Sequence, residues 1–99
     1  MSDHETVECG EGWKSLYEPL IARCKAEGVA VLQVKEKFGG LRFYVGGASD
    51  DLYDAIEEAE SKSFTLCEKC GDPGELRKGR GWWQTLCDRH AQERDASRE

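Results

Sequence analysis

The sequence predicts an α+β fold in which two helices, a β-hairpin and a short metal-stabilised finger share one small core. Three patterns lead to this prediction. Apolar residues between Trp13 and Cys24 recur with helical spacing. Residues 29–45 alternate in polarity around a Gly-Gly pair, as two strands joined by a tight turn do. The C-terminal third carries a Cys-x-x-Cys couplet and a Cys-x-x-His couplet, with sixteen residues between them.

The first helix is expected from Trp13 to Cys24, because apolar side chains there fall on one helical face. Residues 1–10 are polar and acidic, and we expect them to be flexible. Pro19 lies inside the helical pattern, so it should kink the helix or divide it into a short turn and a longer piece. Gly28 provides the signal for the end of this helix.

The hairpin is expected to pair residues 29–38 with residues 41–45, and Gly39-Gly40 is its predicted two-residue turn. In the second strand, apolar residues alternate with Arg42 and Tyr44, so one face should be buried. The basic residues in this hairpin would ordinarily form a solvent-facing strand surface. As a functional surface, Lys37, Arg42 and Tyr44 would form a polar patch.

The second helix is predicted to begin at a cap formed by Ser49 or Asp50 and to end near Lys62. Six acidic residues fall within residues 50–60, and such a run ordinarily forms a solvated helix face. The helix has a narrow apolar stripe, which consists of Leu52, Ala55, Ile56 and Ala59.

The two couplets supply four ligands of the kinds that structural zinc sites use, which are Cys67, Cys70, Cys87 and His90. A Cys-x-x-Cys pair on a tight turn directs both sulfurs at one ion, and Gly71 lets the chain turn away. Cys87 and His90 open a helix-forming run, and residues three apart on a helix share a face. We therefore expect a structural Zn²⁺, with no open coordination position for chemistry.

Two alternative roles for the cysteines stay open. A disulfide framework would leave one of the five cysteines unpaired and would give the His90 spacing no purpose. A redox pair at Cys67 and Cys70 would lie in a βαβ arrangement, which the sequence does not predict. The odd cysteine count and the absence of a secretion signal favour reduced thiols in a cytosol. No role is assigned to Cys9, Cys24 or His4.

Length and charge exclude several classes of protein. Ninety-nine residues make one domain, with a core small enough to need a staple. No apolar run approaches the length that crosses a bilayer, so we expect no membrane span. The net charge of −6 has the wrong sign for a protein that binds duplex DNA by neutralising phosphates.

The finger has the order knuckle, hairpin, helix, which resembles a treble-clef zinc finger over residues 65–92. Nucleases of this topology need a catalytic histidine in the hairpin, and residues 76–86 contain none. A nucleobase deaminase would need a His-x-Glu couplet, which is also absent. No phosphate loop or Ser/His/Asp set is present either, so we expect a protein that is not an enzyme.

Two adjacent tryptophans are the strongest candidates for binding. Adjacent strand residues face opposite sides, so one of Trp82 and Trp83 should enter the core and the other should be more exposed. Both could instead serve packing alone. Trp and Arg are common at binding hot spots, and basic residues surround the pair. The predicted binding residues are Trp82, Trp83, Arg77, Lys78, Arg80, Lys37, Arg42 and Tyr44.

Longer motifs resemble a family of small, largely uncharacterised zinc proteins of bacteria, phages and prophages. The resemblance covers residues 10–92 and rests on Gly12-Trp13, Val34–Tyr44 (VKEKFGGLRFY), Cys67–Gly74 and Thr85–His90. It implies no established activity. Small proteins of mobile elements often neutralise a host factor, so the resemblance implies a protein of the bacterial cytosol that inhibits a host protein, such as a defence component.

The expected partner is therefore a bacterial protein, and the acidic residues 50–60 would fit a basic nucleic-acid channel on it. Two other functions stay open. One is a sponge for a nucleotide signal, and the other is binding of RNA or single strands through the Trp/Arg surface. The expected parts of the chain are residues 1–10 (flexible), 11–63 (α-β-β-α unit), 64–92 (finger) and 93–99 (frayed tail). The oligomeric state is not predicted.

Overall fold

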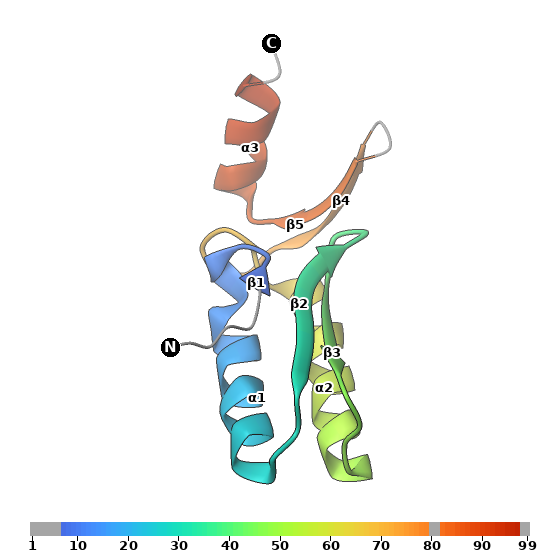
Figure 1. Cartoon of the computed structure of the whole chain (residues 1–99). Coiled ribbons are helices and arrows are strands. Elements are labelled where there is room, and N and C mark those ends of the chain that lie inside the picture. Colours follow the sequence, from blue (N-terminus) through green and yellow to red (C-terminus); the bar gives the residue numbers. More distant parts are fainter. Residues whose placement is uncertain (1–6, 80–81, 98–99) are drawn as a thin grey trace.

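The computed structural model describes residues 7–79 and 82–97, and their side chains except at residues 79, 82 and 95–97. The α+β class is confirmed, with two small sheets of order β1-β2-β3 and β4-β5 (Figure 1). The elements in chain order are β1 (Val7–Glu8), η1 (Glu11–Trp13), α1 (Lys14–Glu27), β2 (Val31–Lys37), β3 (Gly40–Val45), α2 (Asp50–Lys62), η2 (Ser63–Thr65), β4 (Glu75–Gly79), β5 (Trp82–Leu86) and α3 (Asp88–Ser97).

Strand β1 is not among the elements that the sequence predicts, because it falls within the stretch expected to be flexible. It runs parallel to β2, with Val7 opposite Val34 and Glu8 opposite Lys35. Two exposed residues are too short a run to show alternation. Since parallel strands need a crossover, β1, α1 and β2 form a βαβ unit, contrary to the expectation that none is present. The Cys-x-x-Cys couplet lies outside this unit.

Helix α1 passes through Pro19 without a break, so of the two expected outcomes, a kink or a division, the division is wrong. Pro19 removes only the backbone hydrogen bond to the carbonyl of Ser15. Both residues are exposed, so the missing hydrogen bond falls on the solvent side of the helix. The predicted end of the helix is confirmed: Gly28 has a φ of 71°, and the N–H of Val29 donates to the Cys24 carbonyl at 2.8 Å.

The β2–β3 hairpin turns one residue earlier than predicted. Its central residues are Phe38 and Gly39, with φ of 54° and 86°, whereas Gly40 pairs with Lys37 inside the ladder. Positive φ at both central residues is typical of the type I′ turn. Gly40 serves a different purpose, because a Cβ there would lie 2.3 Å from the Phe64 ring. Phe38 therefore holds a left-handed conformation that the sequence pattern assigned to glycine.

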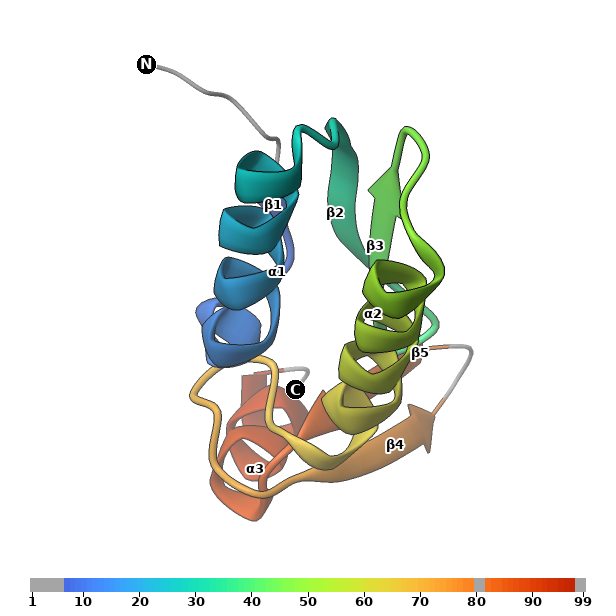
Figure 2. The same ribbon diagram turned by 90° about the horizontal axis from the view of Figure 1, so that it is seen from below.

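One apolar core lies between the three-stranded sheet and helices α1 and α2, which cover the same face of the sheet (Figure 2). The predicted buried face of β3 is confirmed, and Arg42 and Tyr44 are exposed as expected. The Ser49 hydroxyl caps α2 by accepting from the N–H of Leu52 at 3.2 Å. The buried core residues are Trp13, Tyr17, Leu20, Cys24, Val34, Leu41, Phe43, Leu52, Ile56 and Ala59.

Side chains at the end of α2 close the outer edge of β3. The N–H of Leu41 donates to the hydroxyl of Ser63, and the N–H of Phe43 donates to the Glu60 carboxylate, both at 2.9 Å. The Ser63 hydroxyl in turn donates to the Glu60 carbonyl at 2.6 Å. Glu60, expected on a solvated face, therefore satisfies a strand edge that would otherwise be open to pairing.

The finger follows the expected order. A knuckle at residues 67–71 leads into the antiparallel β4–β5 hairpin, and α3 follows directly. Whether this order belongs to the treble-clef class stays a prediction, as does the division of the chain into four parts. Within the described ranges, every helix is too short or too polar to cross a bilayer.

Candidate metal centre and the adjoining groove

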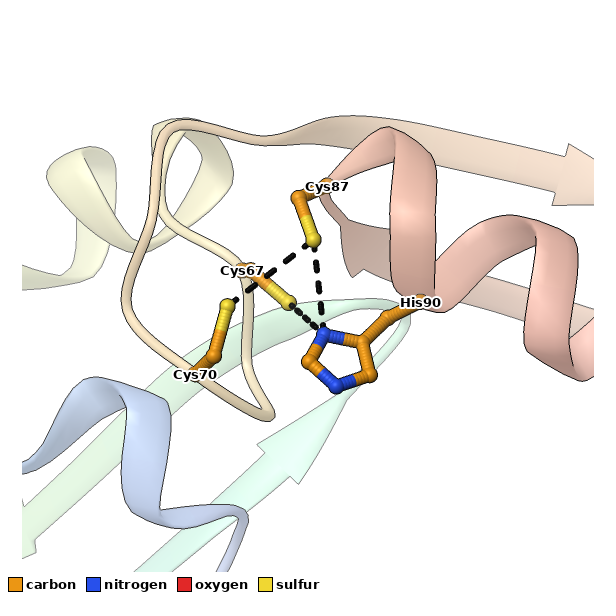
Figure 3. Close-up of side chains that lie close together, drawn as sticks. All are labelled: Cys67, Cys70, Cys87 and His90. Atoms are coloured by element: carbon orange, nitrogen blue, oxygen red, sulfur yellow. Dashed lines mark hydrogen bonds between the residues drawn. The ribbon is translucent and has the colours of Figure 1, made fainter.

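The four predicted metal ligands come together at the base of the finger (Figure 3). Their ligand atoms all lie within 4.8 Å of one another. The Nδ1 atom of His90 is 3.4 Å from the sulfur of Cys67 and 3.3 Å from that of Cys87. The sulfurs of Cys70 and Cys87 are 3.8 Å apart. Two ligands thus come from the knuckle and two from the start of α3.

The two sulfur–nitrogen separations and the one sulfur–sulfur separation fit the edges of a zinc tetrahedron. With Zn–S bonds of about 2.3 Å and Zn–N bonds of about 2.0 Å, tetrahedral S···S edges are about 3.8 Å and S···N edges about 3.5 Å. The sulfur–sulfur separation of 3.8 Å is also far longer than a disulfide bond of about 2.0 Å. All five cysteines are free thiols. The cluster is therefore compatible with a metal ion such as zinc, which the four side chains would enclose.

Short backbone contacts fix the knuckle. The N–H of Cys67 donates to the Asp72 carbonyl at 2.7 Å, and the N–H of Gly71 donates to the Cys67 carbonyl at 2.8 Å. Gly71 has a φ of 84°, a conformation that glycine adopts without steric cost. The N–H of Glu68 donates to the Thr85 carbonyl at 2.9 Å, which ties the knuckle to β5.

The thiols of the cluster differ in acidity. Burial raises the pKa of Cys67, but backbone N–H groups from Cys87 and the knuckle outweigh this effect and lower it to about 6. For Cys70, the N–H of Asp72 lowers the pKa, yet desolvation and the neighbouring thiols raise it to about 11 overall. Cys67 is therefore more readily ionised than Cys70, and a bound cation would favour ionisation of both thiols.

The start of the α-β-β-α unit docks on the knuckle backbone. The N–H of Gly12 donates to the Glu68 carbonyl at 2.7 Å, and the indole N–H of Trp13 donates to the Leu66 carbonyl at 2.9 Å. The Glu68 carboxylate accepts from the N–H of Gly10 at 2.9 Å. Burial raises the pKa of that carboxyl, an effect that this N–H opposes. The finger and the helical unit are thus joined at a closely packed seam, which is formed by Gly10, Gly12, Trp13, Leu66 and Glu68.

A groove of about 1110 Å³ lies beside the metal cluster, where the tip of the β2–β3 hairpin meets β4–β5 and α3. It continues to the cluster itself, since His90 is part of its wall. Aromatic and charged side chains line it together. They are Glu36, Lys37, Phe38, Arg42, Phe64, Glu68, Lys69, Leu76, Trp83, Gln84, His90, Glu93 and Arg94.

Two exposed aromatic rings line this groove. Phe38 is 62% exposed and Trp83 is 41% exposed, and their ring centroids are 6.1 Å apart in an edge-to-face arrangement. An ammonium group lies over each ring: Lys37 is 5.8 Å from the Phe38 centroid, and Lys78 is 4.6 Å from the Trp83 centroid. Both rings are apolar surface that folding leaves in contact with solvent.

The hairpin tip is held against the finger by a buried hydrogen bond. The hydroxyl of Thr85 donates to the carbonyl of Gly39 at 2.7 Å, and Thr85 has no exposed surface. A Cβ at Gly39 would lie 2.4 Å from a methyl group of Leu76, so the two hairpins are in close contact. Phe38 and Trp83 therefore belong to two hairpins, β2–β3 and β4–β5, that hold each other in place.

The structure separates the predicted binding residues into groups. Lys37, Arg42 and Trp83 line the groove, and Lys78 covers the Trp83 ring. The Arg77 guanidinium instead contacts Asp88 at 2.8 Å and donates to the Leu86 carbonyl at 3.1 Å. Of the other predicted residues, only Tyr44 can be placed relative to the groove, and it does not line it. Tyr44 is exposed elsewhere on β3, whereas Arg80 and the side chain of Trp82 lie outside the described residues.

Sequence patterns alone missed Phe38, Phe64, Lys69 and Arg94 as parts of the groove. Phe38 had a usable signal, because a bulky residue directly before a Gly-Gly pair can occupy the first turn position. The other three have none, since they approach only after the finger docks against the β2–β3 tip.

No known protein family, curated protein or solved structure matches this chain significantly. The resemblance to small zinc proteins of phages and prophages is therefore without support from these comparisons, and it stays a prediction. What the molecule binds has to be argued from its own side chains.

Proposed function

We propose that this protein is a non-enzymatic, zinc-stabilised binding protein whose ligand occupies the groove beside the metal cluster. The observation that carries the proposal is the exposed pair of Phe38 and Trp83. Phe38 has a positive φ of 54°, which costs free energy for a bulky residue and persists where the surrounding structure enforces it. Because this strained backbone exposes an aromatic ring and does not bury it, the conformation favours a binding role for Phe38 over a packing role.

Zinc has a structural role in this proposal. The buried cluster of the finger consists of Cys67, Leu86, Cys87 and Ala91, and two of these four are metal ligands. So small a cluster does not hold a fold without a staple. Four protein ligands leave zinc no position for water, so the ion would shape the groove and take no part in chemistry.

Capture from bacterial lysate tests the proposal. The tagged wild-type chain and a Phe38→Ala/Trp83→Ala variant serve as baits, with zinc content measured to confirm that both are folded. We expect a protein, nucleic acid or nucleotide that co-purifies with the wild type and is lost in the variant. A ligand retained equally by both baits, or none with either, would contradict binding through the groove.

We propose, second, that the protein inhibits a bacterial protein by direct binding through the opposite end of the molecule. The observation in its favour is the first three turns of α2, where five acidic side chains are exposed. A row of carboxylates on a rigid helix suits a basic nucleic-acid channel on a partner. These residues are Asp50, Asp51, Asp54, Glu57 and Glu58.

Charge reversal separates this second proposal from the first. Replacing Asp54, Glu57 and Glu58 by lysine should abolish inhibition of a captured partner at low salt, while binding in the groove is unchanged. Inhibition that survives charge reversal would remove the acidic helix from consideration. The groove variant described above is the matched control.

A further inference from the structure

The charges around the groove are uneven in a way that points to its ligand. Five Lys/Arg side chains and three Glu side chains surround it, although the whole chain carries a net charge of −6. Two of the three carboxylates already serve the fold, since Glu36 accepts from the N–H of Gly39 at 2.8 Å and Glu68 accepts from Gly10. These two carboxylates are thus engaged by the protein itself.

The cations are less engaged. Within the described part of the chain, Lys37, Arg42, Lys69 and Lys78 form no ion pair with a carboxylate. Two of these side chains place their ammonium groups over exposed rings, where a cation and a flat apolar surface are offered together. The groove therefore offers cations without carboxylate partners beside exposed rings, and a ligand that carries both anions and planar groups would match it.

We propose that the groove binds a short segment of single-stranded nucleic acid, with bases against Phe38 and Trp83 and phosphates at Lys37, Lys69 and Lys78. The proposal rests on the proposed function and names the ligand class. Single strands alternate planar bases with phosphates, which matches the alternation of rings and ammonium groups in the groove. An acidic peptide would meet the cations but would leave both rings without a planar partner.

The charge distribution accommodates a net acidic protein. The exposed acids of α2 belong to the first turns of that helix, whereas the groove adjoins the finger at the other end of the β2–β3 hairpin (Figure 1). At physiological salt, charges separated by more than about 8 Å are largely screened. A duplex would hide the bases from the two rings, so the proposal is specific to unpaired strands.

With a metal ion bound at its Nδ1 atom, the ring of His90 would also present a donor to the groove. The Nδ1 atom of His90 is directed at the sulfurs, so Nε2 is the ring nitrogen from which a ligand can accept a hydrogen bond. Because His90 lines the groove, loss of the metal would disturb both this donor and the wall formed by α3. We therefore expect chelation of the zinc to weaken binding.

Fluorescence anisotropy with labelled oligo(U) and oligo(dT) of about 12 nucleotides tests the proposal on the full, zinc-loaded chain. We expect at least one of them to bind at low salt. With three phosphates contacted, affinity should fall about 20-fold between 50 and 200 mM salt. Duplex DNA of the same length should bind more weakly, because its bases are paired.

Variants test the contacts one by one. Phe38→Ala and Trp83→Ala should each weaken binding about tenfold, and Trp83→Phe should restore part of the loss. Tyr44→Ala is the matched control, because Tyr44 is 41% exposed like Trp83 but lies outside the groove. Lys69→Gln should reduce the slope of log affinity against log salt by about 0.7, whereas Lys25→Gln on α1 should leave it unchanged.

Several outcomes would overturn the proposal. The first is that neither oligonucleotide binds at low salt. The second is that the Phe38 and Trp83 variants bind as tightly as the wild type. Poly-glutamate that binds as tightly and with the same sensitivity would assign the groove to acidic protein segments. In that case, or if lysate capture yields a groove-dependent protein, the proposed function stands and only the ligand class fails. Failure of the oligonucleotides together with failure of the capture removes both.

Discussion

The α-β-β-α unit and the finger are held together by different forces. The first buries ten apolar side chains between a sheet and two helices, and none of them belongs to the candidate metal site. Among the described side chains, the apolar cluster of the finger has four members, of which Cys67 and Cys87 belong to the candidate metal site. One part of this short chain is thus stabilised by apolar burial, whereas the other has a ligand cluster through which a bound metal ion would stabilise it.

The two parts nevertheless share a seam. Trp13 belongs to the core of the first part, and its indole N–H donates to the Leu66 carbonyl at the entry to the knuckle. Gly12 and Gly10 contact Glu68 in the same region. Because of this seam, loss of one part can spread into the other, and the extent of that spread can be measured.

Removal of the metal is expected to have the largest effect. Structural zinc contributes on the order of 10 kcal/mol to folding of such sites, so chelation should unfold the finger. By hydrogen exchange, amides in β4, β5 and α3 should lose protection, and so should the N–H of Gly12, which bonds to the Glu68 carbonyl. The amides of β2, β3 and α2 should keep theirs.

A Cys87→Ser variant should reproduce this pattern, whereas Cys9→Ser should bind metal normally, because Cys9 lies outside the cluster. Loss of protection throughout the chain upon chelation would contradict the difference between the two parts. It would mean that the apolar core is too small to persist alone and that the two parts form one cooperative unit.

The two parts also differ in how far the sequence predicts them. The order of the elements in the finger and the meeting of its four ligands were predictable, because metal ligands have a fixed geometry and their spacing specifies it. Helix α2 and the buried face of β3 followed from periodicity alone. Strand β1 did not, since Val7 and Glu8 are too few to show a pattern. The groove could not be predicted, because Thr85 and Gly39, far apart in the chain, hold its two hairpins together.

Gly12→Ala should have the next largest effect, because it attacks the seam. An added Cβ would lie 2.1 Å from the Cys67 carbonyl oxygen and 2.5 Å from that of Glu68. Backbone atoms cannot move aside cheaply, so we expect a loss of about 3 kcal/mol in unfolding free energy. Gly46→Ala is the control, since its Cβ would meet nothing closer than 3.6 Å. Equal denaturant midpoints for the two variants would show that the seam does not bear on stability.

Ser63→Ala should destabilise the first part alone. The buried N–H of Leu41 would lose its acceptor, which costs about 2 kcal/mol. Ser61→Ala is the control, because Ser61 is exposed two residues earlier on α2. We expect the same loss in β2 and β3 protection with and without zinc, measured by hydrogen exchange. An effect that appears only in the zinc-loaded protein would show that this edge depends on the finger.

Asp88→Ala should have the smallest effect and should be confined to the finger. The Asp88 carboxylate contacts Arg77 at 2.8 Å and lies in the first turn of α3, but it is 88% exposed. An exposed pair of this kind contributes about 0.5 kcal/mol, and a favourable helix-dipole contact adds a similar amount. Glu75→Ala should cost less, because that carboxylate is 3.7 Å from the guanidinium.

The difference in zinc-loaded thermal stability between wild type and Asp88→Ala should shrink in high salt, since exposed charges are screened. A salt-independent difference would instead assign the loss to the backbone of the turn that presents Cys87. In that case the hairpin would support the metal cluster through its fold and not through charge.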